Sequence, residues 1–428
     1  MPLETHTPTL LAEALRELDA GFASLPDFDA AIPGADRMAS VLNEAALRLR
    51  DNFPYFHPLY AGQMLKPPHP VARAAYALAT WINPNNHALD GGRASSAMEK
   101  EAVAQIAAMF GWDDHLGHLT GGGTMANLEA LWVAGQLQPG KRIVASEQAH
   151  YTHERIGGVL KLPFAKIASD ACGRMDLAAL EAELARGDIG CVVATLGTTG
   201  IGAVDPLPGI LELRKRYGFR VHVDAAYGGY FTLADNVGPN ARAAFDAIGH
   251  ADSIVIDPHK HGLQPYGCGC VLFRDPATGA LYKHDSPYTY FSSRELHLGE
   301  ISLECSRPGA SAVALWATQR LLPLVPGGEF AQGLSAGRRA ALELARRLRA
   351  DERWVVPFEP ELDIVVWAPR ADSAQRIFDE AAKRDLHLAL IRIQGQLCLR
   401  SVLMKPEHEA WIQEITRRLA EAADTPLP

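Results

Sequence analysis

The stretch SIVIDPHKHGLQPYGCG, Ser253 to Gly269, places a lysine directly after a short apolar run. Residues 253–256 are predicted to form a buried strand, and a proline and two glycines within 265–269 to force a turn after it. Lys260 would then enter the interior at a strand end, where desolvation lowers the pKa of a lysine and makes it a nucleophile. The ordinary alternative is a solvent-exposed lysine on a loop.

A second apolar run lies upstream, RVHVDAAYGGYF, Arg220 to Phe231, and it predicts a strand that delivers Asp224 at its end. A buried carboxylate and a buried lysine at neighbouring strand ends suit one cofactor especially well, pyridoxal 5'-phosphate. The lysine forms a Schiff base with it, and the carboxylate keeps the pyridine nitrogen protonated, which makes the ring an electron sink. The pair Asp224 and Lys260 therefore predicts a site for this cofactor.

The region around these two residues alternates between strand-like and helix-like pieces. Such alternation predicts an α/β fold with a mostly parallel sheet and helices on both faces, in which ligands bind at the carboxyl ends of the strands. The predicted strands are Arg142–Ser146, Cys191–Gly197, Arg220–Ala226, Ser253–Ile256 and Cys268–Phe273, and the predicted helices between them are Asp176–Gly187, Leu207–Gly218 and Ala241–Ala251.

Three parts are expected along the chain: a helical, proline-rich segment at 1–75 that packs across a partner subunit, a large domain at 76–320, and a small α+β domain at 321–428. The small domain is predicted from a helix at 330–350, a strand at 362–368, a helix at 372–384, a strand pair at 386–393 and 396–403, and a last helix at 407–423.

Composition excludes several classes of function. Of 428 residues, 48% are hydrophobic and 21% charged, an ordinary globular balance, and the formal net charge of −9 argues against nucleic acid or an anionic membrane as the partner. No run is long enough to cross a membrane, and the first residues lack the pattern of a signal peptide. Six scattered cysteines fit a reduced protein, so a cytoplasmic location is expected.

The run HLTGGGTMANLEAL, His118 to Leu131, places glycines before an amphipathic helix, and backbone N–H groups at such a helix start bind phosphate. Gly123 and Thr124 are the predicted contacts. A dinucleotide fingerprint is the rival, but the residues before Gly121 do not form the continuous apolar strand that this fingerprint needs, and Asp224 and Lys260 would stay unexplained. A glycine-rich helix start without a ligand is the third alternative.

Two further strand ends carry polar side chains. His150, in SEQAHYTHERIGG from Ser146, is in the right place to stack on the cofactor ring and to help protonate the substrate carbon, although a lone histidine is usually structural. His150, His153 and Glu154 match neither common zinc-protease order, so no metal is expected. Thr198, in ATLGTTGIGAVDPL, is predicted to donate to the cofactor, or else it only stabilises its turn.

Together these motifs resemble the group II pyridoxal-phosphate-dependent amino acid decarboxylases of the aspartate aminotransferase (fold type I) superfamily. The resemblance is carried by TGGGTMANLEAL, SEQAHYTHERIGG, VHVDAAYGGY and DPHKHGLQPYGCG, in that order, and by HPLYAGQM from His57 and NPNNHALDGGRASSAMEKE from Asn83. SPYTYF and ECSRPGASAVALWATQRLLPL are similar to the bacterial tyrosine decarboxylase branch. The likeness covers about residues 50–325 well and the remainder loosely.

The resemblance implies a role for each matching position. Lys260 would bind the cofactor covalently, Asp224 would hold its pyridine nitrogen, and His150 and Ala226 would pack on opposite faces of the ring. The phosphate would be held by Gly123, Thr124 and His259, with Ser306 contributed by the partner chain of a homodimer whose active site lies at the interface. A loop at 286–304 would supply the tyrosine that protonates the substrate carbon, either Tyr288 or Tyr290; this loop is somewhat shorter than expected of the family.

Decarboxylation of an L-amino acid to the amine and CO2 is the predicted reaction, because a phenol on a closing loop supplies one proton while excluding water. The alternatives are an aldehyde synthase, a carbon–carbon lyase related to sphingosine-phosphate lyase, and a catalytically dead binding protein. An aromatic substrate such as tyrosine is favoured if the side chains at 55, 56, 60, 87 and 89 line the pocket, whereas Arg93 and Arg307 could serve an acidic one.

Overall fold

The computed structural model describes residues 6–29, 34–283 and 296–425 of the chain. Its centre is a seven-stranded sheet in the order β1-β7-β6-β5-β4-β2-β3. The neighbours from β6 to β3 pair in parallel, whereas β7 is antiparallel to both β6 and β1. The strands are β1 (Leu116–Thr120), β2 (Arg142–Ser146), β3 (Phe164–Ile167), β4 (Ile189–Thr195), β5 (Arg220–Asp224), β6 (Ser253–Ile256) and β7 (Gly269–Phe273).

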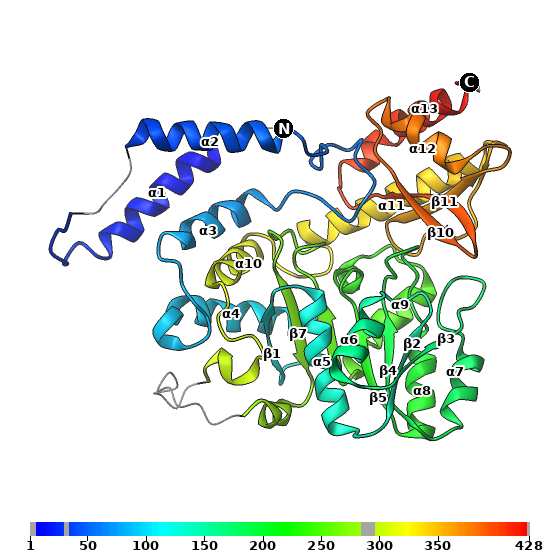
Figure 1. Ribbon diagram of the computed structural model, residues 1–428, viewed down its shortest axis with the longest axis horizontal. Helices are drawn as coiled ribbons and strands as arrows, with labels where there is room; N and C mark the ends of the chain where they lie inside the picture. Colours follow the sequence, from blue (N-terminus) through cyan, green and yellow to red (C-terminus); the bar gives the residue numbers. More distant parts are fainter. Residues whose placement is uncertain (1–5, 30–33, 284–295, 426–428) are drawn as a thin grey trace.

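Helices cover both faces of this sheet, as Figure 1 shows. These helices are α4 (Leu89–Met109), α5 (Gly123–Leu137), α6 (Thr152–Leu160), α7 (Leu177–Leu184), α8 (Leu207–Tyr217), α9 (Pro239–Asp246) and α10 (Gly309–Leu321), and α3 (Pro70–Thr80) packs outside them against α10. Short 3-10 turns lie between them: η1 (Gly229–Leu233), η2 (Ile248–His250), η3 (Pro276–Tyr282) and η4 (Leu298–Ile301). The predicted α/β fold with a mostly parallel sheet is confirmed.

The two-residue period of the strands explains why both faces need a cover. In β4, Cys191 and Val193 pack with Leu131 of α5 in one apolar cluster. Val192 and Ala194, between and after them, belong to the larger cluster on the opposite face. A strand that is apolar on both faces stays dry only between two helical layers, and this is the pattern that a parallel sheet requires.

The strand β1 was not predicted, because its sequence LGHLT carries a histidine where an apolar residue was expected. His118 is fully buried, and its Nε2 lies 3.0 Å from Oε2 of the equally buried Glu129 on α5, so the polar ring has a partner in the core. The strand lies at the sheet edge, paired only with the antiparallel β7. A strand thus does precede the glycine motif, but outside the parallel βαβ arrangement that a dinucleotide fingerprint needs.

The C-terminal part forms a second, four-stranded antiparallel sheet in the order β10-β11-β9-β8. Its strands are β8 (Trp354–Val355), β9 (Ile364–Pro369), β10 (Ala389–Ile393) and β11 (Gln396–Val402), and its helices are α11 (Glu329–Arg349), α12 (Ala374–Ala382) and α13 (His408–Ala423). The predicted helices and strands of this region are confirmed, with β8 as an addition. Its own apolar cluster lies between α11, α13 and the sheet.

Two helices at the N-terminal end, α1 (His6–Ala20) and α2 (Ala35–Leu49), bury no residue in the single chain. Figure 1 shows them beside α3 and away from both sheets. The segment that follows is different, because Tyr60 forms a bridge with His387 and Ala61 N donates to the His387 carbonyl, next to the small sheet. Within the described ranges, no helix has the length and apolar character needed to cross a membrane.

Candidate active site

A cavity of about 370 Å³ lies at the carboxyl ends of β4, β5 and β6 and at the start of α5. This size is within the usual range for small-ligand sites. It is lined by Gly121, Gly122, Gly123, Thr124, Met125, Asn127, His150, Thr152, Thr195, Gly197, Thr199, Asp224, Ala226, Tyr227, Asp257, His259, Lys260, Tyr266 and Gly267. Seven of the residues that the sequence predicts for the site are therefore brought together: Lys260, Asp224, His150, Gly123, Thr124, Ala226 and His259.

Lys260 lies in the turn that follows β6, and its side chain is 21% exposed. Its Nζ is 3.0 Å from Oδ2 of Asp257, and its backbone N–H donates to the Asp257 carbonyl. Asp257 is the residue that directly follows β6, and its Oδ1 has no hydrogen-bond partner among the described residues. Asp257 was not predicted as a site residue, although it belongs to the stretch Ser253 to Gly269.

Asp224 is the last residue of β5 and is buried. Its Oδ2 is 2.8 Å from Nε2 of His153, and its Oδ1 accepts a hydrogen bond from the Ala226 N–H. Burial alone raises the pKa of this carboxyl, but the hydrogen bond and charge of His153, followed by the charge of Lys260, outweigh burial and hold the pKa well below its usual range. The site therefore presents a buried anion at the wall of the cavity.

His150 lies between β2 and α6 and borders the cavity. Its Nδ1 accepts from the Thr152 backbone N–H at 3.3 Å and contacts the Thr152 hydroxyl at 2.5 Å. Burial lowers the pKa of His150, and the charge of Asp224 opposes this only in part. Because Nδ1 is the acceptor, the neutral ring carries its proton on Nε2.

The glycine run places backbone N–H groups toward the cavity. Gly122 has a φ of +141°, a backbone conformation that residues with a side chain rarely adopt. It precedes α5, whose first turn has no side-chain cap. A Cβ on Gly123 would lie 2.7 Å from Oδ2 of Asp257, so only glycine lets the helix start approach that carboxylate. The first N–H groups of α5 are thus left for a ligand anion.

These residues fit pyridoxal 5'-phosphate by their donor chemistry. An uncapped helix start suits its phosphate, an ionised buried carboxylate suits its pyridinium nitrogen, and the Lys260 amine lies at the same cavity. Within the described ranges, no group of three or more His, Cys, Asp or Glu side chains is arranged to hold a metal ion. A dinucleotide fingerprint would also need an acidic residue at the end of the next strand. Glu147, which follows β2, holds that place, but it accepts hydrogen bonds from Ser169 and does not line the cavity.

Thr198 is not brought to the cavity. Its hydroxyl oxygen accepts a hydrogen bond from the Ala203 N–H at 3.0 Å, and its side chain is fully buried in the turn after β4. Thr195 and Thr199 line the cavity instead. The Thr195 hydroxyl is buried and has no hydrogen-bond partner among the described residues, which makes it the available donor that sequence reasoning missed.

His259 lines the cavity next to Lys260. Its Nδ1 bonds to the Cys268 carbonyl at 2.7 Å, which fixes the ring, and its Nε2 is 3.6 Å from Asp257. The ring of Tyr266 lies against it, with centroids 4.7 Å apart. Tyr266 was not predicted as a site residue, although it is part of the quoted stretch.

Ser306 does not line this cavity in the described chain. Ser306 is exposed, and its hydroxyl accepts from Nδ2 of Asn85 at 3.1 Å. Tyr288 and Tyr290 lie outside the described residues.

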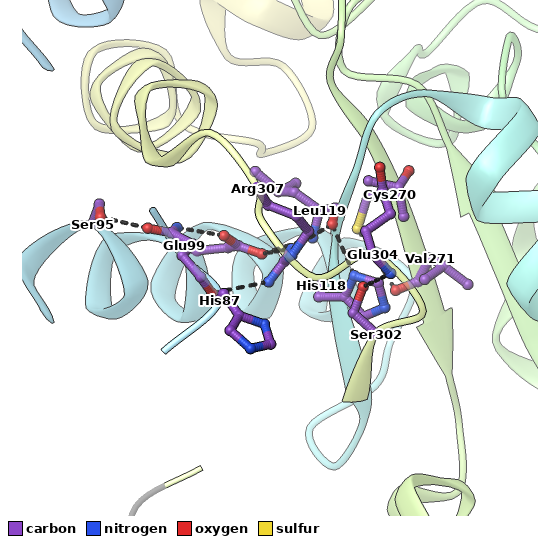
Figure 2. A network of polar contacts seen from close by, with 12 residues as sticks. His87, Ser95, Glu99, His118, Leu119, Cys270, Val271, Ser302, Glu304 and Arg307 are labelled. Carbon is purple, nitrogen blue, oxygen red and sulfur yellow. Dashed lines mark hydrogen bonds and ion pairs between the residues drawn. The ribbon is translucent and has the colours of Figure 1, made fainter. Parts of the chain in front are cut away.

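The residues considered for substrate recognition also lie elsewhere. None of Tyr55, Phe56, Tyr60, His87 and Leu89 lines the cavity at the strand ends. Arg307, shown in Figure 2, is buried and donates to Oε1 of Glu99 at 2.8 Å and to the Leu119 carbonyl at 2.6 Å. Its guanidinium is committed to holding α4 against β1, so it is not free to receive a substrate carboxylate. Arg93 is exposed on α4.

Comparison with known proteins gives a consistent result. Residues 52–369 match the family described as the pyridoxal-dependent decarboxylase conserved domain. L-tyrosine decarboxylase of Enterococcus faecium is 31% identical over 415 residues, which cover 73% of this chain and 67% of that protein. A probable L-aspartate decarboxylase of Pyrococcus abyssi is 27% identical over 374 residues, which cover 84% of this chain and 90% of that protein.

Among solved structures, Oryza sativa TDC with PLP and tryptamine superposes with a TM-score of 0.79 at 19% identity, over 98% of this chain and 99% of that chain. This likeness supports the fold. The family match extends over most of the chain and includes every cavity residue described above. The chain therefore belongs to the pyridoxal-dependent decarboxylase family, whose enzymes are pyridoxal-phosphate-dependent carboxy-lyases that act on amino acids.

Proposed function

We propose that this enzyme removes the carboxylate of an L-amino acid as CO2 and releases the amine, with Lys260 and Asp224 holding the reactive ends of the cofactor. The observation that carries the proposal is their placement: an amine and an ionised carboxylate line one cavity at neighbouring strand ends. When bound, pyridoxal 5'-phosphate supplies a conjugated ring that accepts the electron pair of the broken Cα bond.

The other cavity residues have complementary tasks. His150 and Ala226 would close opposite faces of the ring and keep it perpendicular to the bond that breaks, since orientation selects which Cα bond is cleaved. The phosphate would be held by Gly123, Thr124 and His259, supported by the uncapped start of α5. The Thr195 hydroxyl adds an unpaired donor at the same wall.

Protonation of the substrate carbon is assigned to a tyrosine, Tyr288 or Tyr290, outside the described residues. A phenol meets the requirement because it can deliver one proton to that carbon. His150 lines the cavity, and because its Nδ1 accepts from Thr152 the proton of the neutral ring lies on Nε2, so it would support this transfer.

An aromatic L-amino acid such as tyrosine is the favoured substrate. Among the described lining residues, Lys260 is the only lysine or arginine, and Arg307 is held by Glu99. No guanidinium of these residues is therefore offered to an acidic side chain, which is the feature that recognition of aspartate would need. The Enterococcus faecium relative named as a tyrosine decarboxylase supports the same choice.

A homodimer in the cytoplasm is the proposed state. The helices α1 and α2 contain no buried residue in one chain, and large apolar side chains on and after them are exposed, which supports a partner surface. These are Leu10, Phe22, Leu25, Phe28, Met38, Val41, Leu42, Leu47, Leu49 and Phe53. The described cysteines are all unpaired, as in a reducing compartment.

Product analysis tests the proposal. The protein loaded with pyridoxal 5'-phosphate is incubated with a mixture of amino acids, and amines, aldehydes and CO2 are quantified by mass spectrometry. One aromatic amine formed together with CO2 is the expected result, and the Lys260→Ala variant should form neither. An aldehyde product would instead identify an aldehyde synthase, and turnover of aspartate alone would overturn the aromatic preference.

A further inference from the structure

His153 is a buried residue at the cofactor end of β5 that the proposed roles leave unused. It lies at the start of α6, three residues after His150, and its side chain is fully buried. Its Nε2 lies 2.8 Å from Oδ2 of Asp224, which comes from a strand 71 positions away in the sequence. Since a carboxylate oxygen only accepts, Nε2 is the donor of this hydrogen bond.

The hydrogen bond to Asp224 is the polar contact that the surroundings of His153 provide. Its Nδ1 is buried and has no hydrogen-bond partner among the described residues. The nearby His222 is engaged elsewhere, with its ring nitrogens 2.8 Å from Ser253 and 2.8 Å from Asn127. If His153 only filled space, an apolar ring would do so at a lower desolvation cost, because a buried nitrogen without a hydrogen bond is unfavourable.

The Asp224 carboxylate needs a donor of this kind. Its other oxygen, Oδ1, receives a single backbone N–H, from Ala226, at 3.1 Å. Lys260 lies at the same cavity, but its Nζ is paired with Asp257 at 3.0 Å. Without His153, a nearly buried carboxylate would keep one backbone hydrogen bond, and desolvation would favour its neutral form, which is unable to hold a pyridinium.

We infer that His153 is a positioning residue that keeps Asp224 ionised and fixes the direction in which its carboxylate faces the pyridine nitrogen of the cofactor. This inference rests on the proposed role of Asp224. It assigns to His153 no contact with the substrate. Its effect reaches the reaction through the protonation of the ring, which determines how well the ring accepts electrons.

The test replaces the donor and restores it. His153→Phe keeps a planar ring but donates nothing, whereas His153→Gln returns an amide N–H near the position of Nε2. The readout is the 15N chemical shift of pyridoxal 5'-phosphate labelled at the pyridine nitrogen and bound to each protein. We expect a protonated nitrogen in the wild type and in His153→Gln, and a largely unprotonated one in His153→Phe, with kcat lower by about tenfold or more and KM little changed.

A matched control is His118→Phe, which removes the buried imidazole paired with Glu129 away from the cavity. It should lower the stability of the fold and leave the 15N shift as in the wild type. Should His153→Phe not fold, His153→Met removes the same donor. A donor-free variant with a protonated nitrogen and wild-type kcat would overturn the inference.

The proposed role of Asp224 is tested separately, by the same 15N measurement on the Asp224→Asn variant. If that variant loses the protonated nitrogen and His153→Phe does not, Asp224 keeps its role and the inference about His153 fails. If neither variant changes the labelled nitrogen of a bound cofactor, the assignment of Asp224 itself is wrong.

Discussion

Thr195 ends β4 and Thr198 lies three residues later in the turn, and the structure gives the two hydroxyls different tasks. The Thr195 hydroxyl lines the cavity and is unpaired among the described residues, whereas the Thr198 hydroxyl accepts the only hydrogen bond that the Ala203 N–H donates. We expect Thr195→Val to weaken binding of pyridoxal 5'-phosphate severalfold without loss of stability. Thr198→Val should leave binding unchanged and cost about 1–3 kcal/mol, because it orphans a buried N–H.

Fluorescence titration with the cofactor and chemical unfolding of the cofactor-free protein measure the two effects. Each variant is the control of the other, since both remove one hydroxyl at constant shape. Weaker cofactor binding in Thr198→Val, with Thr195→Val unaffected, would reassign the donor to the residue that the sequence first suggested.

At the residue scale, sequence predicts best where the chemistry is local. Lys260, Asp224 and His150 each follow a recognisable apolar run, and all three reach one cavity. His153 could not be singled out, because its partner Asp224 is distant in the sequence and a histidine three residues after another suggests a helix face. The choice between Thr195 and Thr198 depends on the shape of one turn, which periodicity does not specify.

At the scale of elements, Asp363 links the two sheets beside the active site. It directly precedes β9 and is almost fully buried, and its Oδ1 accepts from the Tyr227 hydroxyl at 2.6 Å. Its Oδ2 lies 3.3 Å from Nε2 of His261, the residue next to Lys260. Burial raises the pKa of Asp363 to about 6, although the Tyr227 hydrogen bond and the charge of Lys66 oppose this rise.

The direction of the pH dependence follows from this shift. A raised pKa means that the folded protein holds this proton more tightly than the unfolded chain does, so the stabilisation is complete below about pH 4 and is lost as the pH rises through about 6. The Asp363→Asn variant has no proton to lose at this position, so its stability lacks this pH dependence. Between pH 4.5 and pH 7 the unfolding free energy of the wild type should therefore fall relative to the variant by about 2 kcal/mol.

Urea unfolding of the cofactor-free proteins at the two pH values measures this difference. Asp379→Asn, on the exposed part of α12, is the control and should follow the wild type. Parallel pH profiles of wild type and Asp363→Asn would show that this carboxylate is already ionised at the lower pH.

Helices and strands themselves were predictable where hydrophobic periodicity was clear. The strands β4 and β6 are continuous apolar runs and were predicted, and β5 was predicted from the alternating valines of RVHVD. In contrast, β1 and β3 were missed; the short sequences LGHLT and FAKI each carry a polar residue, His118 or Lys166. His118 is tolerated only through Glu129, which belongs to another element. Pairings of that kind are decided by tertiary structure.

At the scale of the whole molecule, one predicted cofactor residue lies on the surface of the single chain. Ser306 is exposed and does not line the cavity of its own chain. It belongs to the segment that also holds Arg307, whose buried pair with Glu99 fixes this part of the chain against α4 (Figure 2). A fixed, outward-facing hydroxyl is available to a neighbouring subunit, so the proposed homodimer predicts that Ser306 serves the phosphate of its partner.

Subunit complementation tests this arrangement. Lys260→Ala and Ser306→Asp should each be inactive as homodimers, the first without its amine and the second with a carboxylate that repels phosphate. Mixed dimers then contain one site with Lys260 from one chain and Ser306 from the other, both intact. Equal co-expression should restore about a quarter of wild-type activity, since half of the dimers are mixed and each has one working site.

Mixed dimers are isolated through two different affinity tags, and their activity is compared with that of the tagged homodimers. Lys260→Ala paired with Asp224→Asn is the control that distinguishes the alternatives. Both of these residues line the cavity of their own chain, so each site of that mixed dimer carries one of the two defects and no activity should return. If Lys260→Ala with Ser306→Asp also returns none, Ser306 acts within its own chain or not at all, and the dimer would have to be explained by α1 and α2 alone.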